Sequence, residues 1–512
     1  AYGFAIKQGT GMQYESIAAV DLGSNSFRLE VGRVVDDQIY TLDSLKDAVR
    51  LASGLQADKS LDQASQDRAL VALSRFGERL RGLPKDAVRA VATNALRVAK
   101  NANNFLAEAE AALGFPIEII AGREEARLIY IGAVHSLPAS DQQRLVFDIG
   151  GGSTEFIIGS GMKPLKLESL FMGCVSYSLR YFPDGIIDRR RLREAQMAAA
   201  KEVSLIAHAY KQTGWGEAIG SSGTASAIAE ILEQNDLNPR GVTGITRSGL
   251  DKLCALMIRY KHIDALPLQG VKSDRIPVLP GGIAIMSAII DTLGIERVTY
   301  ADGALRLGVL YDLLGRFHHH DMRTATVKHF QRRYQVESDQ ANRVSETAVE
   351  IFSDLMGLKL RSTEERERDL QFVRWAAALH EVGLSIAHSG YHKHGAYILG
   401  YADMPGFSKM DQARLALLVL CHRGKLNKVD GLSREDMAWR QILALRLAVI
   451  LHRSRLESGV PDLQASETVN GFTLQLPAVW LEDNPMTMAA LRDETSIWEE
   501  AGFRLRIRAT RR

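Results

Sequence analysis

The sequence of 512 residues contains three cysteines, Cys174, Cys254 and Cys421, which lie far apart in the chain. Isolated cysteines exclude a disulfide framework and a cysteine-based metal knuckle, and they are typical of a reducing cytosol. An excess of charge of one sign is also missing, because 63 basic and 61 acidic residues leave a formal net charge of +2. A polyanionic ligand would therefore have to be met by local basic patches rather than by a global field.

Long hydrophobic runs are absent as well. The longest apolar segment, residues 276–290, is interrupted by Pro277, Pro280, Gly281 and Gly282 and is too short to span a bilayer. No N-terminal signal pattern is visible, so we expect a cytoplasmic protein without a transmembrane segment. The hydrophobic content of 46%, in contrast, supports large cores, and the length predicts about three or four domains.

The most informative segment is residues 145–155, with the sequence LVFDIGGGSTE. An apolar run that predicts a buried strand ends at Asp148, and Gly150, Gly151 and Gly152 follow. Such a loop lets several backbone N–H groups converge on an anion, while the carboxylate can hold a divalent cation beside it. The segment alone indicates either a site for phosphate with Mg²⁺ or an ordinary glycine-rich turn.

Residues 17–31, IAAVDLGSNSFRLEV, repeat this layout. The apolar run ends at Asp21, a short loop with Gly23, Ser24 and Asn25 follows, and alternating apolar residues begin a second strand. Strand, acidic glycine loop and strand form a hairpin, whereas a helix follows the glycines of a Rossmann unit or a Walker loop. This internal repeat predicts two related α/β domains whose loops face one phosphate in a cleft, and it favours the phosphate–metal interpretation.

Two further places follow predicted strands and suit phosphate. Thr93 and Arg97 lie at a strand-to-helix junction, although a capping threonine and a surface arginine would give the same pattern. A third glycine loop, with Ser222, Gly223 and Thr224, opens another helix and is either an anion site or a plain helix start.

Glu124 and Glu125 open the helix that follows a predicted strand at 117–120. Acidic residues in a first turn favour a helix through its dipole, and one of the two could instead orient or deprotonate an attacking water. Adjacent helical residues point about 100° apart, so at most one of them should reach the cleft.

The character of the chain changes after residue 315, where acidic glycine loops end and helical periodicity dominates residues 324–456. Residues 466–512 contain two strand-like stretches and predict a small α/β unit. We therefore expect domains at 12–133, 134–315, 316–465 and 466–512.

Seven segments resemble the exopolyphosphatase / guanosine pentaphosphate phosphohydrolase family of the sugar kinase–heat-shock chaperone–actin superfamily. In the family's order they are AVDLGSNSFRL (19–29), TNALRVA (93–99), GREEARLIY (122–130), VFDIGGGSTE (146–155), GSSGT (220–224), LPGG (279–282) and DGALRLGVLY (302–311). The resemblance implies two tandem actin-like (ribonuclease H-like) α/β domains with an interdomain cleft, followed by a mainly helical HD-like domain and a small C-terminal α/β unit.

The histidine-rich residues 379–399 are similar to the HD-like domain of the long bacterial exopolyphosphatases. A working HD metal site needs adjacent His and Asp, and here Glu381 follows His380, so we interpret these histidines as structural residues or polyanion contacts. The basic residues that follow form either a polyphosphate track or a solvated helix face. They include Arg414, Arg423, Lys425 and Lys428.

The resemblance implies Mg²⁺-dependent, processive hydrolysis of terminal phosphate from inorganic polyphosphate. Glu125 would activate the water, and Glu155 would lie near the metal or the water. Asp21 and Asp148 would hold Mg²⁺ from opposite domains, and Thr93 and Arg97 would help to bind phosphate. The loop residues that would bind the terminal phosphates are Gly23, Ser24, Asn25, Gly150, Gly151, Gly152, Ser153, Ser222, Gly223 and Thr224.

Guanosine pentaphosphate shares the reacting group with polyphosphate, so hydrolysis of pppGpp to ppGpp is an alternative main activity. The long C-terminal half favours polyphosphate. The family implies a homodimer, no nucleic acid partner is expected, and a requirement for a monovalent cation such as K⁺ stays open.

Three other functional classes fit part of the pattern. A kinase of the same superfamily would need an adenine pocket and a catalytic Asp, whereas Glu124 and Glu125 suit water activation. A non-enzymatic nucleotide sensor would not need the full set of acidic residues, Asp21, Glu125, Asp148 and Glu155. An HD-type phosphohydrolase would depend on His380 instead of Asp148.

Overall fold

The computed structural model describes residues 16–35, 38–138, 140–301, 304–317, 322–356, 363–402, 404, 406–407, 409–429, 431–455 and 459–510. The chain divides into two compact units, Ala1–Asp321 and Met322–Arg512. Two expected features, the start of the first domain at 12–15 and the Asp-Gly pair at 302–303, lie outside the described residues.

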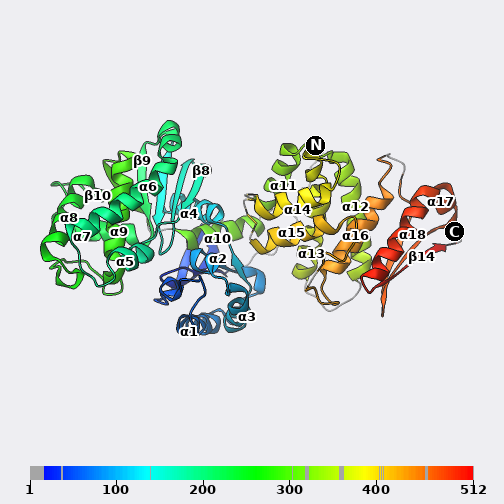
Figure 1. The fold of residues 1–512 in the computed structure, drawn as a ribbon, viewed down its shortest axis with the longest axis horizontal. Coiled ribbons are helices and arrows are strands. Elements are labelled where there is room, and N and C mark those ends of the chain that lie inside the picture. The colour runs from blue at the N-terminus through cyan, green and yellow to red at the C-terminus, as the bar shows by residue number, and fades with distance from the viewer. Residues whose placement is uncertain are drawn as a thin grey trace, which may run out of the picture. The chain divides into compact units, whose positions relative to one another are not determined.

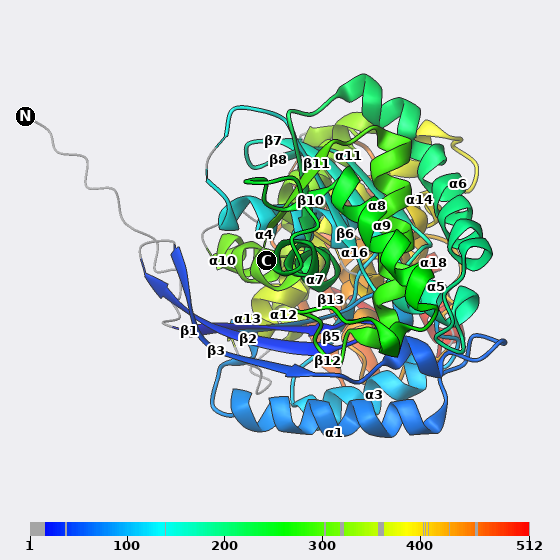
Figure 2. The same ribbon diagram turned by 90° about the vertical axis from the view of Figure 1, so that its left-hand side faces the viewer.

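The first sheet of the first unit has the strand order β3-β2-β1-β4-β5. Its strands are β1 (Ser16–Leu22), β2 (Phe27–Val35), β3 (Gln38–Asp47), β4 (Val88–Ala92) and β5 (Ile117–Ile119). β1 and β2 form the predicted antiparallel hairpin, and β4 runs parallel to β1. Helices α1 (Gln63–Leu80) and α3 (Ala102–Leu113) lie side by side against one face of this sheet (Figure 2).

The helix α1 shows how the local sequence sets an element. Asp62 begins the helix by accepting a hydrogen bond from the Ser65 N–H at 2.7 Å. The spacing of Leu73, Phe76 and Leu80 then places all three side chains in the core under the sheet.

The second sheet repeats the first with one added strand. Its order, β10-β11-β9-β6-β7-β8, read backwards gives β8-β7-β6-β9-β11, which matches β3-β2-β1-β4-β5. The strands are β6 (Arg144–Ile149), β7 (Thr154–Ser160), β8 (Lys163–Leu170), β9 (Glu217–Ser221), β10 (Ile245–Thr246) and β11 (Arg297–Ala301). β6 and β7 form an antiparallel hairpin, and β9 runs parallel to β6, as β4 does to β1. The predicted internal repeat is thus confirmed at the level of topology.

Helices pack around this second sheet (Figure 1). They are α5 (Cys174–Tyr181), α6 (Arg189–Thr213), α7 (Ser222–Gln234), α8 (Arg247–Tyr260) and α9 (Leu279–Leu293). Among the described residues, one helical segment, Ile276–Leu293, has the length and composition of a membrane span, and 72% of it is buried in this unit. It is the central helix of the second core.

Two helices join the two sheets. These are α4 (Gly122–Ser136) and α10 (Leu305–Phe317), which pack against each other and share one core with β1, β4, β6 and β7. Side chains of both sheets therefore contact the same helix pair, which fixes the position of one hairpin relative to the other.

The second unit begins with helices and ends with a small sheet. The helices are α11 (Met322–Arg333), α12 (Ser338–Met356), α13 (Thr363–Leu379), α14 (Tyr391–Tyr401), α15 (Lys409–Cys421) and α16 (Ala438–Leu451). The sheet has the order β12-β13-β14. Its elements are β12 (Gln464–Thr468), β13 (Gly471–Pro477), α17 (Ala478–Asp483), α18 (Pro485–Glu500) and β14 (Arg504–Thr510).

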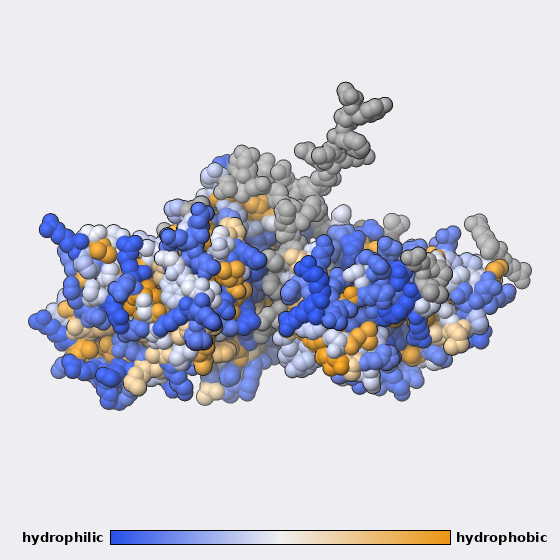
Figure 3. Space-filling model, turned by 90° about the horizontal axis from the view of Figure 1, so that it is seen from above, coloured by the Kyte–Doolittle hydropathy of each residue, from blue (hydrophilic) through white to orange (hydrophobic). Residues whose placement is uncertain are grey.

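The C-terminal sheet and the helices of this unit share a single hydrophobic core. A buried ion pair reinforces the join, because Arg446 of α16 donates a hydrogen bond to Glu494 of α18 at 2.8 Å. On the surface, hydrophilic residues predominate in the view of Figure 3, where hydrophobic residues form small separate groups.

Candidate active site

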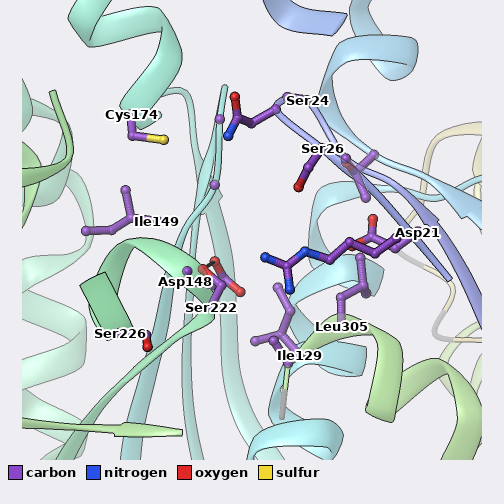
Figure 4. A pocket seen from close by; sticks show the side chains of 18 of the residues that line it. Asp21, Ser24, Ser26, Ile129, Asp148, Ile149, Cys174, Ser222, Ser226 and Leu305 are labelled. Atoms are coloured by element: carbon purple, nitrogen blue, oxygen red, sulfur yellow. Dashed lines mark hydrogen bonds between the residues drawn. The ribbon is translucent and has the colours of Figure 1, made fainter. Parts of the chain in front are cut away.

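The carboxyl ends of the central strands of both sheets open into one cavity of about 280 Å³ within the first unit. Both hairpin loops line it. Figure 4 shows Asp148 and Ser222 on one wall, and Asp21 and Ser24 on the opposite wall. The cavity therefore lies where the repeat predicts a shared site.

The two hairpins carry different charges at equivalent positions. Asp21 of β1 pairs in register with Arg28 of β2, and Asp148 of β6 pairs in register with Glu155 of β7. All four residues line the cavity. The first hairpin thus contributes one acid and one base, and the second contributes two acids.

The two loops touch at Gly151. A Cβ atom there would lie 2.8 Å from the Cβ of Ser24 and 3.3 Å from the backbone N of Asn25, so a larger residue would push the loops apart. Backbone N–H groups of both loops consequently border the same space, which suits an anion with several oxygens.

Glu125 enters the cavity from the first turn of α4 and is buried. Its Oε2 accepts a hydrogen bond from Arg97 Nη1 at 2.9 Å, and the same Nη1 donates to the Ile120 carbonyl at 2.9 Å. Burial raises the pKa of Glu125 to about 7, against the opposing effect of Arg97. A carboxyl group with a pKa near neutrality can accept a proton from water and release it again.

Glu124, the adjacent residue, does not line the cavity. Its two oxygens accept from Arg127 at 2.8 and 2.7 Å, and Arg127 also donates to Asp312 at 2.6 Å. The prediction that at most one of the two glutamates reaches the cleft is consistent with this arrangement.

Asp148 is held by two serines at the start of α7. Ser221 donates to one carboxylate oxygen at 3.0 Å and Ser222 donates to the other at 2.5 Å. Ser222 adopts a left-handed backbone conformation with φ 66°, which is strained for a residue with a side chain. Burial still raises the pKa of Asp148 above its usual range.

Asp21 is half-buried, but its Oδ1 is inaccessible to solvent and has no hydrogen-bond partner among the described residues. Burial raises its pKa to about 6, although Arg306 and Arg28 act in the opposite direction. A buried carboxylate oxygen without a donor needs a ligand to compensate for its lost hydration.

This donor set fits a hard divalent cation. Among the described residues no three His, Cys, Asp or Glu side chains form a metal cluster. Mg²⁺ does not need one, because it usually keeps several waters and binds through one or two carboxylates plus the phosphates of the substrate. The unpartnered oxygen of Asp21 suits such a cation.

Glu155 completes the acidic group. Ser169 donates to its Oε1 at 2.8 Å, yet burial, followed by the charges of Glu125 and Asp148, raises its pKa well above the usual range. Four carboxyl groups, three of them on buried residues, therefore line one cavity, and bound positive charge is needed to keep all four ionised.

The cavity also contains basic side chains that the sequence analysis did not assign. They are Arg28, Lys46, Lys272, Arg275 and Arg306. The sequence repeat could have pointed to Arg28, because Arg28 occupies the position in the first hairpin that Glu155 occupies in the second.

Of the remaining four, Arg306 lies within the segment 302–311 that resembles the family but had no role assigned, and the other three come from places without a local motif. Arg306 is held by Glu30, whose Oε2 accepts from its Nε at 3.1 Å. Arg275 packs against Gly223, where a Cβ atom would lie 1.9 Å from Nη2. Lys46 of β3 forms an ion pair with Asp274 at 2.5 Å, which connects the first sheet to a loop of the second half.

Most of the predicted phosphate-binding residues line the cavity, and three do not. Gly23, Ser24, Asn25, Thr93, Gly150, Gly151, Ser153, Ser222 and Gly223 line it. Arg97 lies behind Glu125, Gly152 packs against Asn94, and Thr224 donates its hydroxyl to the Ile149 carbonyl at 2.9 Å. Asn94 itself lines the cavity and was not predicted.

In the second unit the basic residues of the predicted track differ in exposure. Arg414 pairs with Asp369 at 2.7 Å and with Gln441, and it stacks on Phe372. Arg423 and Lys425 are exposed.

Lys428 is half-buried and donates to the Arg423 carbonyl at 2.9 Å. The nearby histidines His380 and His422 are buried, and each has its Nδ1 2.6 Å from a carbonyl of its own helix end. Both therefore contribute to the helix packing of this unit.

The fold and the cavity define an actin-like α/β protein with an acidic, phosphate-compatible site between two related halves. Residues 30–317 match the Ppx/GppA phosphatase family, and residues 322–495 match domain III of Ppx/GppA phosphatases. The chain belongs to the Ppx/GppA phosphatase family and is a hydrolase of phosphoanhydride bonds.

Two curated relatives are similar over nearly the whole chain. A guanosine-5'-triphosphate,3'-diphosphate pyrophosphatase of Aeromonas hydrophila is 38% identical over 96% of this chain and 98% of its own length. A protein of the same name from Photobacterium profundum is 36% identical over 95% of this chain and 97% of its own.

Solved structures cover the first part of the chain. A crystal structure of an exopolyphosphatase from Cytophaga hutchinsonii matches 59% of this chain and 98% of that protein, with 24% identity and a TM-score of 0.53. A family member from Aquifex aeolicus matches 59% of this chain and 98% of that protein, with 25% identity and a TM-score of 0.50. The similarity to the Cytophaga hutchinsonii structure is evidence for the fold and not for the function.

Proposed function

We propose that this protein is a guanosine pentaphosphate 5'-phosphohydrolase, which converts pppGpp to ppGpp and orthophosphate. The observation that carries the proposal is the likeness over nearly full length to two proteins that bear this activity in their names. From the sequence, the long C-terminal half favours polyphosphate as the main substrate, whereas these relatives favour the alternative. Hydrolysis of inorganic polyphosphate is the second candidate, because the reacting phosphoanhydride is the same in both.

In this proposal Glu125 is the general base. Its carboxylate takes one proton from a water whose oxygen forms a bond to the terminal phosphorus, while the bond from phosphorus to the bridging oxygen breaks. The bridging oxygen keeps the electron pair and leaves with ppGpp. Arg97 holds the carboxylate in place through the bond of 2.9 Å to Oε2.

Asp21 and Asp148 would hold Mg²⁺, and Glu155 would lie beside the metal or the water. The metal, when bound, supplies positive charge to the phosphate oxygens and to the buried carboxylates. Arg28, Arg275 and Arg306 line the same cavity and would neutralise the phosphates that do not react. The backbone N–H groups of the two hairpin loops would bind the terminal phosphate.

We place the protein in the cytoplasm and expect a homodimer. A track for long polyphosphate would use Arg423, Lys425 and Lys428 of the second unit, because Arg414 is already paired with Asp369. A requirement for K⁺ can be tested by measuring orthophosphate release after K⁺ is replaced by a bulky organic cation.

The test is orthophosphate release with Mg²⁺ from guanosine pentaphosphate and from long-chain polyphosphate. We expect the higher kcat/KM for guanosine pentaphosphate. A higher value for polyphosphate would reverse the order of the two candidates, and no release from either would remove both.

The track is tested with Arg423→Ala combined with Lys425→Ala. We expect a higher KM for long polyphosphate and an unchanged KM for guanosine pentaphosphate. Lys328→Ala combined with Arg332→Ala removes the same charge from exposed positions of α11 and is the matched control.

A further inference from the structure

The cavity extends along one face of α7, beyond the residues to which the reaction is assigned. Ser222, Ser226 and Glu230 follow each other at intervals of four residues, and all three line the cavity. Figure 4 shows Ser222 and Ser226 on the wall that also carries Asp148. With a rise of 1.5 Å per residue, Glu230 lies about 12 Å along the helix from the serine that holds Asp148. The cavity therefore has a reacting end and a remote end.

At the remote end the cavity is lined by the carboxylate of Glu230, by small residues and by Lys272. Glu230 is half-buried, and its Oε1 accepts a hydrogen bond from Gln234 Nε2 at 3.1 Å, which orients the group. Ala227 and Gly270 line the cavity beside it. A Cβ atom on Gly270 would lie 2.9 Å from Oε1 of Gln234 and 3.2 Å from Cγ of Glu230, so the backbone of Gly270 packs closely against both side chains.

The loop that carries Gly270 is fixed in place from both sides. Asn235, at the end of α7, exchanges two hydrogen bonds of 3.0 Å with the backbone of Gln269. Lys46 of β3 binds Asp274 further along the same loop. The narrow space between Ala227, Gly270 and Glu230 is thus formed before any ligand binds.

A carboxylate is a poor neighbour for a phosphate, because the two repel each other and neither donates a hydrogen bond. It is a good acceptor for adjacent neutral N–H groups on a flat ring. The Watson–Crick edge of guanine carries two such donors side by side, the N1–H and the 2-amino group. Adenine presents an acceptor at N1 and no 2-amino group.

We propose that Glu230 reads the guanine base of the substrate and so selects a guanine nucleotide over an adenine nucleotide and over polyphosphate. This assignment rests on the proposed function, because it places the 5'-phosphates at the reacting end. Gln234 acts as a positioning residue, and the close packing of Gly270 against Gln234 and Glu230 holds both side chains in place. Polyphosphate gains nothing from Glu230.

The test is the affinity of Glu230→Gln for three ligands, measured by titration calorimetry in a Glu125→Gln background so that no ligand is consumed. The ligands are guanosine pentaphosphate, its adenosine counterpart and long-chain polyphosphate. Because hydrogen bonds to a charged acceptor are involved, we expect guanosine pentaphosphate to bind about tenfold more weakly or worse. The other two should bind unchanged or more tightly. Glu194→Gln removes an exposed carboxylate from α6 of the same unit and is the control.

A second variant, Glu230→Lys, reverses the charge at this position and provides an independent test of the assignment. It should bind polyphosphate more tightly and lose the preference for guanine over adenine. Equal changes for all three ligands in Glu230→Gln, or no preference for guanine in the parent protein, would overturn the assignment. If guanine preference depends on Glu230 but the unmodified enzyme releases no orthophosphate, the base-reading role stands and the proposed function falls.

Discussion

Glu124 and Glu125 are neighbours in the first turn of α4, and both are buried, but they belong to two different kinds of charge cluster. Glu124 lies in a cluster in which every charged group has a direct ion-pair partner, called the matched cluster below: Arg89, Arg127, Glu118 and Asp312 form ion pairs of 2.6 to 3.2 Å with it or with each other. Glu125 lies in the cavity with Asp21, Asp148 and Glu155, and its ion-pair partner among the described residues is Arg97, at 2.9 Å.

The difference between the clusters separates structure from function. The neighbouring acids raise the pKa values of Arg89 and Arg127, so the matched cluster is held fully charged. In the cavity, burial raises the pKa values of the acids instead, so ionising all of them costs free energy in the folded state. Buried acids whose pKa values rise although basic side chains lie nearby indicate where a ligand supplies further positive charge.

The largest expected effect is the loss of turnover in Glu125→Gln. The amide keeps the shape of the side chain but cannot accept the proton of the water, so kcat should fall by about 10²–10⁴. Binding of guanosine pentaphosphate should persist, since the phosphates contact other residues. Orthophosphate release under single-turnover conditions measures the first effect, and calorimetry measures the second. A kcat within threefold of the wild-type value would contradict the role of Glu125.

The adjacent variant, Glu124→Gln, should act on stability instead. It weakens the hydrogen bonds that Arg127 donates at this position, while Arg127 keeps its ion pair with Asp312, so the cost should be about 1–3 kcal/mol. We expect a lower free energy of unfolding in urea, and a kcat close to wild type for the molecules that remain folded. If Glu124→Gln instead abolished turnover without loss of stability, the contrast between the two glutamates would be wrong.

Asp21→Asn tests the cost of the unmatched cluster. Since burial raises the pKa of Asp21 from 3.8 to about 6, ionisation destabilises the folded protein above pH 6 by about 3 kcal/mol, and this cost vanishes below about pH 4. Removing the carboxylate should therefore raise the free energy of unfolding at pH 8 and change it little at pH 4. The measurement is urea unfolding at both pH values with a chelator present, so that no divalent cation contributes. A loss of stability at pH 8 would contradict the argument.

The fold could be predicted because its signals are local. Each hairpin can be recognised within 15 residues from an apolar run, an acidic residue and a glycine loop. The repeat of that pattern predicts two sheets with the same strand order. The helix at the third glycine loop begins at Ser222 in the structure, and the hydroxyl of Ser222 donates a hydrogen bond to Asp148 at 2.5 Å. That hydrogen bond joins residues 74 positions apart, so no local sequence pattern predicts it.

The candidate site was predictable only in part, for the same reason. The acids and loop residues that line the cavity belong to contiguous motifs. Arg275 and Lys272 come from a loop without glycine-rich or acidic patterning, and only tertiary packing against Gly223 brings Arg275 to the site. Arg97 was predicted to bind phosphate, and its hydrogen bond to Glu125 could not be read from the sequence, because the two side chains come from different helices.

The smallest of these effects concerns Arg97 and the acidic limb of the pH profile. Burial raises the pKa of Glu125 to about 7, and Arg97 opposes that rise, so kcat/KM should increase with pH through about 7 as the base loses its proton. Arg97→Gln removes the positive charge but can still donate a hydrogen bond. The pKa of Glu125 should then rise further, and the acidic limb should move to higher pH by about one unit. Arg97→Lys keeps the charge and should leave the limb near its original position. A limb at the same pH in all three proteins would mean that Arg97 does not set the charge state of Glu125, and the contrast between matched and unmatched clusters would then rest on burial alone.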